Sequence, residues 1–223
     1  MTSDQTDQCN EPERGSTRLP SGLTMSDAKK QIKDRLAFRG LNVRFRDIRW
    51  GMIVSASRVL ALKLRLGKRV EVGFDTHIGP NCRLIVLDTA RVRLRGAFLS
   101  RSVVIDASKN GVLEIGRSWI GPGSIISAQQ FVSIGDGSLI ADYVTIRDQN
   151  HIQSPEVPLS SWRYTTAPVL IGHDVWIASK VTVVAGVTIA DHAMCAAGAV
   201  VTKNVDSWQK VGGVPAHPLR SDN

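Results

Sequence analysis

The sequence predicts an all-β fold, a parallel β-helix of six-residue repeats, because three regularities coincide near its C-terminal end. Apolar residues recur at every sixth position without a break, at Ile171, Ile177, Val183, Ile189, Cys195 and Val201. A companion register lies four residues later, at Val175, Val181, Val187, Ala193 and Ala199. Small residues directly follow members of the first register, at Gly172, Ala178, Ala190 and Ala196. A helix would space apolar residues by three and four, and a simple strand by two, so a period of six indicates a short strand and a tight corner in each repeat.

The same period appears upstream with interruptions. It returns in three blocks, at Val72, Ile78 and Leu84, at Ile120, Ile126 and Val132, and at Ile134, Ile140 and Ile146. The spacing slips to five from Ile115 to Ile120 and to two from Val132 to Ile134, and residues 89–111 show no clear six. We expect bulges or irregular turns at these slips. A stack of such coils buries one continuous apolar column, in which each coil is supported mainly by its neighbours.

The repeats also divide the chain. Residues 70–206 form the predicted β-helix domain. Residues 1–24 hold almost no large apolar side chains, so we expect a disordered tail. Residues 25–69 form a basic segment that is expected to cap the stack, with a short helix over Ser26–Arg39. Residues 207–223 are rich in Gly and Pro, so they are expected to leave the stack as a loop or tail with at most a short helix.

The net charge of +8 is concentrated, because residues 27–71 carry thirteen Lys or Arg against four acids. Such a stretch attracts nucleic acid, anionic lipid or a phosphorylated ligand, and it is equally typical of a solvated basic face. The sequence lacks a helix-turn-helix, zinc-finger or RNP-like motif, which disfavours nucleic acid. It also lacks a secretory signal and an apolar run of about 18 residues, so we expect a cytoplasmic protein. Contact with the anionic inner face of a membrane is a hypothesis that rests on charge alone.

The cysteines and most histidines indicate no metal site. Cys9, Cys82 and Cys195 form no C-x-x-C pair, so neither a disulfide framework nor a thiolate metal centre is predicted. Cys195 lies on the six-residue register and is expected to be an inert core thiol. Four histidines occupy variable repeat or tail positions and are expected on the surface: His77, His173, His192 and His217.

The segments IGHDVWIASKVTVVAGVTIADHAMCAAGAVVTK and VGGVPAHPLR resemble the hexapeptide-repeat acyltransferases. The similarity covers about residues 70–220, and its nearest branch is the galactoside, maltose and polysaccharide O-acetyltransferases. The resemblance implies a left-handed β-helix, a homotrimer with active sites in the clefts between subunits, and acetyl-CoA as the acetyl donor without a metal. Periodicity alone specifies none of these.

A loop over residues 147–168 interrupts the repeat with RDQNHIQSPEVPLSSWRYTTAP, and His151 lies near its start. Long excursions from a regular scaffold are more often functional than decorative. Acetyl transfer needs a hydroxyl made nucleophilic near neutral pH, and a histidine with a pKa of about 6.5 is suited to accept that proton. The resemblance assigns this general-base role to His151, with Asp148 and Asn150 as possible cleft residues. The alternative is a solvent-exposed loop histidine.

The resemblance also implies a set of residues that contact coenzyme A: Ala178, Ser179, Ala197, Thr202, Lys203 and Arg220. Lys203 and Arg220 would face its phosphates, while the small residues would let backbone donors approach the pantetheine arm. Trp176 is a candidate for the wall of the thioester cleft. The alternatives are tight corner packing for Ala197 and its neighbour Gly198, and solvated charges for Lys203 and Arg220.

The sequence therefore predicts an acetyl-CoA-dependent O-acetyltransferase that acts by direct transfer on a sugar hydroxyl in surface polysaccharide. Two alternatives stay open, an N-acetyltransferase of an amino sugar nucleotide and a non-catalytic β-helix scaffold. A γ-type carbonic anhydrase on the same scaffold is disfavoured, because His151 and His173 are separated by the loop and no close His pair follows.

Overall fold

The computed structural model describes residues 45–73, 75–158, 161 and 163–220, with the backbone alone over 45–54. The chain divides into two compact units, and the second, Ile48–Asn223, contains nearly all of the elements described below. The tail predicted over 1–24 and the helix predicted over 26–39 lie outside the described residues.

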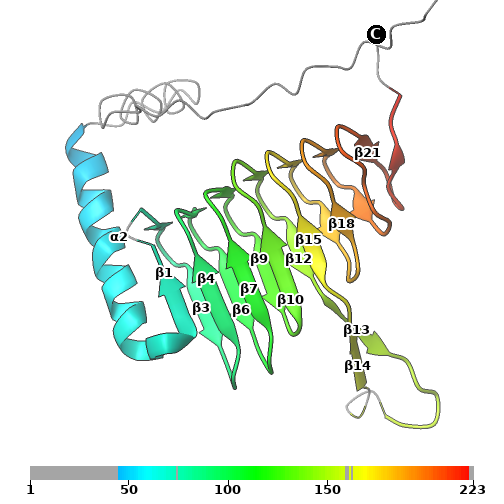
Figure 1. Cartoon of the computed structure of the whole chain (residues 1–223), viewed down its shortest axis with the longest axis horizontal. Helices are drawn as coiled ribbons and strands as arrows, with labels where there is room; N and C mark the ends of the chain where they lie inside the picture. The colour runs from blue at the N-terminus through cyan, green and yellow to red at the C-terminus, as the bar shows by residue number, and fades with distance from the viewer. Residues whose placement is uncertain (1–44, 74, 159–160, 162, 221–223) are drawn as a thin grey trace, which may run out of the picture. The chain divides into compact units, whose positions relative to one another are not determined.

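Most strands belong to three sheets that share the coils of one β-helix, and these sheets are parallel except for the last strand of sheet B (Figure 1). Sheet A contains β1 (Val70–Val72), β4 (Arg91–Leu94), β7 (Val112–Ile115), β10 (Phe131–Ile134), β15 (Val169–Ile171) and β18 (Thr188–Ile189). Sheet B contains β2 (His77–Ile78), β5 (Phe98–Leu99), β8 (Trp119–Ile120), β11 (Leu139–Ile140), β16 (Trp176–Ile177), β19 (Met194–Cys195), β21 (Lys210–Gly212) and β22 (His217–Pro218). Sheet C contains β3 (Arg83–Val86), β6 (Val104–Ala107), β9 (Ile125–Ala128), β12 (Thr145–Arg147), β17 (Thr182–Val183) and β20 (Val200–Val201). The chain visits A, B and C in turn, so each coil has three sides, and the predicted parallel β-helix is confirmed.

Both apolar registers of the sequence point into the coil. Ile177 and Val183 from the first register and Val181 from the second are each 0% exposed. The corners are tight where small residues were predicted to be needed. A Cβ on Gly135 would lie 2.5 Å from the carbonyl oxygen of Gly172 in the next coil, so a larger residue would force the two coils apart.

The slips in the period have a simple structural cause, which is the changing length of the coils. The register pairs Val70 with Val92 and Val92 with Leu113, so the first two coils are both longer than three repeats of six. The coil then shortens, because Leu113 pairs with Val132 and, further along, Ile171 pairs with Ile189. Only the last of these coils, from Ile171 to Ile189, is as long as three repeats of six residues.

The bulges expected at two of the slips are therefore replaced by regular features. Val132 and Ile134 both point inward from the four-residue strand β10. The step from Ile115 to Ile120 reflects a corner that is one residue shorter than the corner between Ile134 and Ile140.

The first coil is closed by a helix that the sequence patterns missed, α2 (Phe45–Leu66). Val59, Leu62 and Leu66 pack against the core. Ser55 and Arg58 satisfy the outer edge of β2, because the Ile78 N–H donates to Ser55 Oγ at 2.8 Å and Arg58 Nη1 donates to the Ile78 carbonyl at 2.9 Å. An unpaired edge at this end would be a template for aggregation, so the helix protects it. Among the described residues, no helix is both long and apolar enough to cross a membrane.

Two other segments are more regular than expected. The loop predicted over 147–168 contains an antiparallel pair, β13 (Gln149–Ile152) and β14 (Arg163–Thr166). The segment from Ser207 was expected to leave the stack, yet β21 pairs in parallel with β19 and places Val211, 4% exposed, beside Cys195. The described residues 207–220 contain no helix. Val211 continues the inward apolar column outside the six-residue period, which explains why the sequence pattern did not reveal it.

Candidate active site

The hairpin β13–β14 is anchored at its neck by Asp148. This carboxylate is fully buried and accepts the backbone N–H groups of Gln129 at 2.8 Å, Gln130 at 2.7 Å and Phe131 at 2.8 Å. The neck is closed by a backbone hydrogen bond of 2.9 Å from Ala167 N–H to the Asp148 carbonyl. Charge-assisted bonds of this kind are about twice as strong as neutral ones. The side chain of Asp148 therefore acts within the coil, and it fixes where the hairpin leaves it.

His151 lies on β13 of this hairpin, directly opposite Tyr164 on β14. The two rings have centroids 4.2 Å apart with an angle of 39° between their planes. Asn150, the neighbouring predicted cleft residue, pairs with Thr165 and is exposed. His151 is thus an exposed histidine on a paired strand, where the sequence indicated a loop.

Three of the residues predicted to contact coenzyme A lie together at the corner between sheets B and C. Ala178 and Ser179 belong to one coil and Ala197 to the next. The Gly198 N–H donates to the Ser179 carbonyl at 2.9 Å, and Ser179 Oγ donates to Asp142 Oδ1 at 2.6 Å. Ala178 is buried, whereas Ala197 is exposed. The corner presents small side chains and peptide groups, as a pantetheine arm would need.

The other predicted residues lie elsewhere on the surface. Thr202 and Lys203 follow β20, at the corner between sheets C and A, and both are exposed. Arg220 follows β22 and is exposed. Trp176 stands on the outer face of sheet B with 46% of its surface exposed.

Within one chain, the predicted base and the predicted coenzyme A corner lie apart. The hairpin follows β12, whereas Ala178 and Ser179 precede β17. Since β12 and β17 are neighbouring parallel strands, with Thr145 opposite Thr182, these groups lie at opposite ends of sheet C. A single chain therefore does not assemble all of the predicted site residues at one place.

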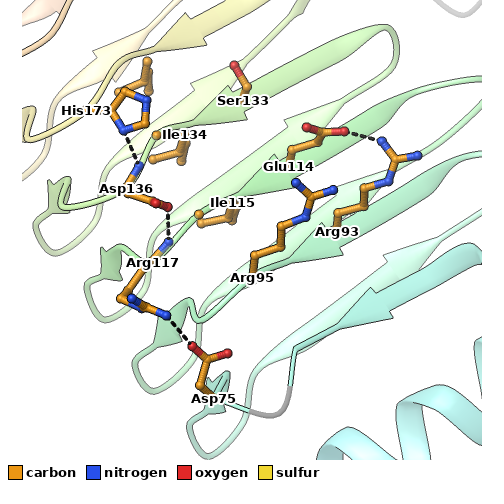
Figure 2. Close-up of a pocket in the computed structure, with 13 residues that line it drawn as sticks. Asp75, Arg93, Arg95, Glu114, Ile115, Arg117, Ser133, Ile134, Asp136 and His173 are labelled. Atoms are coloured by element: carbon orange, nitrogen blue, oxygen red, sulfur yellow. Dashed lines mark hydrogen bonds and ion pairs between the residues drawn. The ribbon is translucent and has the colours of Figure 1, made fainter. Parts of the chain in front are cut away.

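A groove of about 540 Å³ lies on the outer face of sheet A, beside the corner that leads to sheet B (Figure 2). Its charged side chains largely neutralise one another. Arg93 forms ion pairs with Glu71 and Glu114, and Arg117 Nη2 lies 3.0 Å from Asp75 Oδ2. The groove contains neither His151 nor any residue predicted to contact coenzyme A. Of the four histidines expected on the surface, His173 lines this groove. The Nδ1 atom of His173 accepts the Asp136 N–H at 3.1 Å.

Cys195 has the properties of a core thiol. It is 0% exposed, and burial raises its pKa to about 12. The thiolate is the nucleophilic form of cysteine, so this residue is unreactive near neutral pH. No group of three or more His, Cys, Asp or Glu side chains gathers as a metal site within the part of the chain that the structure describes.

No protein-family profile matches the chain. Curated relatives are acetyltransferases. Galactoside O-acetyltransferase from Escherichia coli is 34% identical over 50% of this chain and 55% of its own length. A putative lipopolysaccharide biosynthesis O-acetyl transferase of the same organism, WbbJ, is 31% identical over 44% of this chain and 54% of its own length. The chain thus spans about half the length of the curated relatives it matches.

Solved structures share the fold. An N-acyltransferase from Bacillus cereus, in complex with dTDP and 3-hydroxybutyryl-CoA, superposes with a TM-score of 0.56 at 14% identity, over 74% of this chain and 88% of its own. A hexapeptide-repeat acetyltransferase from Vibrio cholerae, complexed with acetyl coenzyme A, has a TM-score of 0.51 at 20% identity, over 82% and 92%. The predicted left-handed β-helix and the resemblance to hexapeptide-repeat acyltransferases are confirmed.

Proposed function

We propose that this protein is an acetyl-CoA-dependent O-acetyltransferase that modifies a sugar hydroxyl of surface polysaccharide, with His151 as general base. The observation that carries the proposal is the hairpin, which holds an exposed histidine on a paired strand outside an otherwise continuous coil. Relatives with sugar-modifying names, galactoside O-acetyltransferase and the lipopolysaccharide O-acetyl transferase, support the reaction class.

In the proposed reaction, His151 accepts the proton of the acceptor hydroxyl while the hydroxyl oxygen attacks the thioester carbonyl of acetyl-CoA. The carbon–sulfur bond then breaks, and the leaving coenzyme A sulfur takes up the proton from the His151 imidazolium, which restores the base. General-base catalysis of this kind contributes about 10²–10⁴-fold. Direct transfer fits the raised pKa of Cys195, which keeps this thiol protonated.

We assign acetyl-CoA to the corner between sheets B and C. Ala178 and Ala197 leave room for the pantetheine arm, and Ser179 adds a hydroxyl beside it. Lys203 and Arg220, both exposed, are the proposed cations for the phosphates, with Lys203 across sheet C from this corner. Trp176, half exposed on the adjoining sheet, forms one wall of the cleft.

The protein is proposed to act as a homotrimer, because one chain separates the base from the coenzyme A corner across sheet C. A heterologous contact between copies brings one corner of a protomer against a different corner of the next. The hairpin of one protomer then reaches the Ala197 corner of its neighbour, and the site is complete only between two copies.

An apolar column on the outer face of sheet B supports this assembly. Its side chains are His77, Phe98, Trp119, Leu139, Trp176 and Met194, which stand opposite one another in register. His77 stacks on Phe98 and Phe98 on Trp119, each at 4.3 Å between centroids. Both faces of the Phe98 ring are covered within this stack, so this part of the column offers a flat apolar wall of ring edges. Such a wall suits another protein surface better than a sugar ring, which stacks on an open aromatic face.

Cytoplasmic location and contact with an anionic membrane also remain proposals. The exposed Leu60 and Leu64 of α2, followed by the exposed Arg65 and Lys68, support a surface helix that meets anionic lipid. Cosedimentation with anionic vesicles at low salt tests this contact, and protein that stays in the supernatant contradicts it.

The decisive experiment for the reaction is thiol release from acetyl-CoA with a panel of acceptors. The panel contains neutral and acidic oligosaccharides and an amino sugar nucleotide. We expect ester products with the former and loss of turnover by about 10²-fold or more in His151→Gln. An amide product would reassign the protein to N-acetylation, and no turnover with any acceptor would favour the non-catalytic scaffold.

A further inference from the structure

We propose that Tyr164 is a positioning residue for His151 and that Lys109 holds Tyr164 in turn, so that two side chains connect the coil to the general base. This inference rests on the proposed function of His151. It assigns an orienting partner of the histidine, which the sequence does not identify.

The first contact lies within the hairpin. His151 and Tyr164 are cross-strand partners on β13 and β14, and their ring centroids lie 4.2 Å apart with a 39° tilt. Cross-strand aromatic pairs are among the stabilising contacts of antiparallel strands. Both side chains are exposed, so the imidazole could adopt several rotamers without this contact. The contact with Tyr164 therefore restricts the orientation of the imidazole.

The second contact joins the hairpin to the coil. Lys109 belongs to the corner between β6 and β7, and its Nζ lies 4.7 Å from the centre of the Tyr164 ring. An ammonium group within about 6 Å of an aromatic centroid makes a favourable cation–π contact. Lys109 therefore reaches the hairpin from the same corner of an earlier coil.

The backbone of Lys109 is itself fixed. Its N–H donates to Asp88 Oδ2 at 2.9 Å, and its carbonyl accepts the Thr89 N–H at 3.1 Å. Its φ of 56° lies in the left-handed region, which a residue with a Cβ adopts in a tight turn only when its surroundings hold it there. The series of contacts from Lys109 through Tyr164 to His151 thus begins at a fixed point of the coil.

Asp148 does not compete for this role, because its carboxylate is committed to the turn of the preceding coil. Its Oδ1 accepts the Gln129 N–H, and its Oδ2 accepts the N–H groups of Gln130 and Phe131. Asp148 fixes where the hairpin leaves the coil, whereas Tyr164 fixes the plane of the imidazole within it. A general base must hold its lone pair on the path of the proton, so a loss of orientation lowers the rate of the chemical step without weakening coenzyme A binding.

The test compares Tyr164→Leu, which removes the ring, with Tyr164→Phe, which keeps it, in the full-length protein. We expect Tyr164→Leu to lower kcat about tenfold with the KM for acetyl-CoA unchanged within about twofold, and Tyr164→Phe to stay within about twofold of wild type. Lys109→Met should lower kcat by a smaller factor of about three. Trp208→Leu is the matched control, because Trp208 stacks on His192 at 4.2 Å outside the candidate site, and it should leave kcat unchanged.

NMR spectroscopy tests the contact between His151 and Tyr164 independently of the reaction. In protein labelled with ¹³C-histidine, the His151 ring resonances, identified by their loss in His151→Gln, should move downfield in Tyr164→Leu and stay in place in Tyr164→Phe. This arm needs no turnover, so wild-type protein that fails to acetylate any acceptor contradicts the proposed function alone. Unchanged His151 resonances in Tyr164→Leu overturn the stack, and wild-type kcat in that variant overturns the positioning role.

Discussion

The buried carboxylate of Asp148 accepts the backbone N–H of Phe131 at 2.8 Å, and this bond ties the neck of the hairpin to the first residue of β10. The N–H groups of Gln129 and Gln130 bond to the same carboxylate. Three peptide donors in one turn thus depend on a single side chain. Loss of this carboxylate would leave buried or half-buried N–H donors without partners, which is among the costlier defects in a protein interior.

We therefore predict that Asp148→Ala lowers the free energy of unfolding by about 3 kcal/mol, because the orphaned N–H groups retain their desolvation cost. Urea unfolding at one fixed protein concentration measures the change. Asp136→Ala is the matched control, since Asp136 accepts a single N–H, from Arg117, in an exposed position and should cost about 1 kcal/mol or less. Equal losses in the two variants would contradict the anchoring role.

His77 should make the stability depend on pH. Burial, and then the charge of Arg58, lower the pKa of His77 below its ordinary value of about 6.5. In the unfolded chain His77 takes up a proton as the pH falls below about 6.5, whereas in the folded protein it resists protonation. Its contribution to stability is thus present above that pH and is lost as the pH falls through the lowered folded pKa.

The measurement is the thermal midpoint of unfolding between pH 8 and pH 5, for wild type and for His77→Phe. We expect the midpoint of wild type to fall more steeply on acidification, because the variant has no imidazole to protonate and extends the stack on Phe98. Parallel curves for the two proteins would show that His77 does not carry this dependence.

Cys195→Ala should keep the acetyl transfer rate within about threefold of wild type, because a thiol with a pKa of about 12 is not a nucleophile near neutral pH. The same substitution should lower stability by about 1–2 kcal/mol through loss of buried volume. Initial rates and urea unfolding measure the two effects. A Cys195→Ala variant that folds but has lost turnover would revive a covalent acyl-enzyme mechanism.

The apolar column on sheet B should hold the oligomer together. Leu139→Glu places a charge in the middle of the column, while Leu170→Glu places the same charge on sheet A at nearly equal exposure, 38% for Leu170 and 39% for Leu139. We expect Leu139→Glu to shift the mass measured by light scattering from trimer to monomer and Leu170→Glu to leave the trimer intact. Dissociation by Leu170→Glu alone would move the interface to sheet A.

The fold was easiest to predict where the coil length matches the repeat. From Ile171, whose partner in the next coil is Ile189, three repeats of six fill each coil and the pattern is unbroken. Upstream, the longer coil from Val70 to its partner Val92 follows no such rule, and the inward column there is continuous in space but irregular in sequence. The helix α2 was missed because its apolar positions are interleaved with many basic residues.

At the candidate site, as in the fold, the sequence revealed local patterns but not contacts between distant segments. His151 was identified from its place at the start of an interruption, which is visible in the sequence. Tyr164 lies near the other end of that interruption and becomes its partner only through the pairing of β13 with β14, while Lys109 approaches from an earlier coil. No spacing rule predicts a contact that depends on how many coils separate two corners.

An active site shared between two chains predicts that two inactive variants complement each other, whereas a site within one chain does not. His151→Gln removes the base from one corner, and Ala197→Trp fills the coenzyme A corner at the other, so each variant alone should be inactive. Co-expressed in equal amounts, the two should recover up to about a quarter of the wild-type rate, because one contact in four pairs an intact hairpin with an intact corner. Initial rates of the purified mixed trimers measure the recovery. If both elements came from the same chain, every site in the mixture would keep one defect and no activity would return.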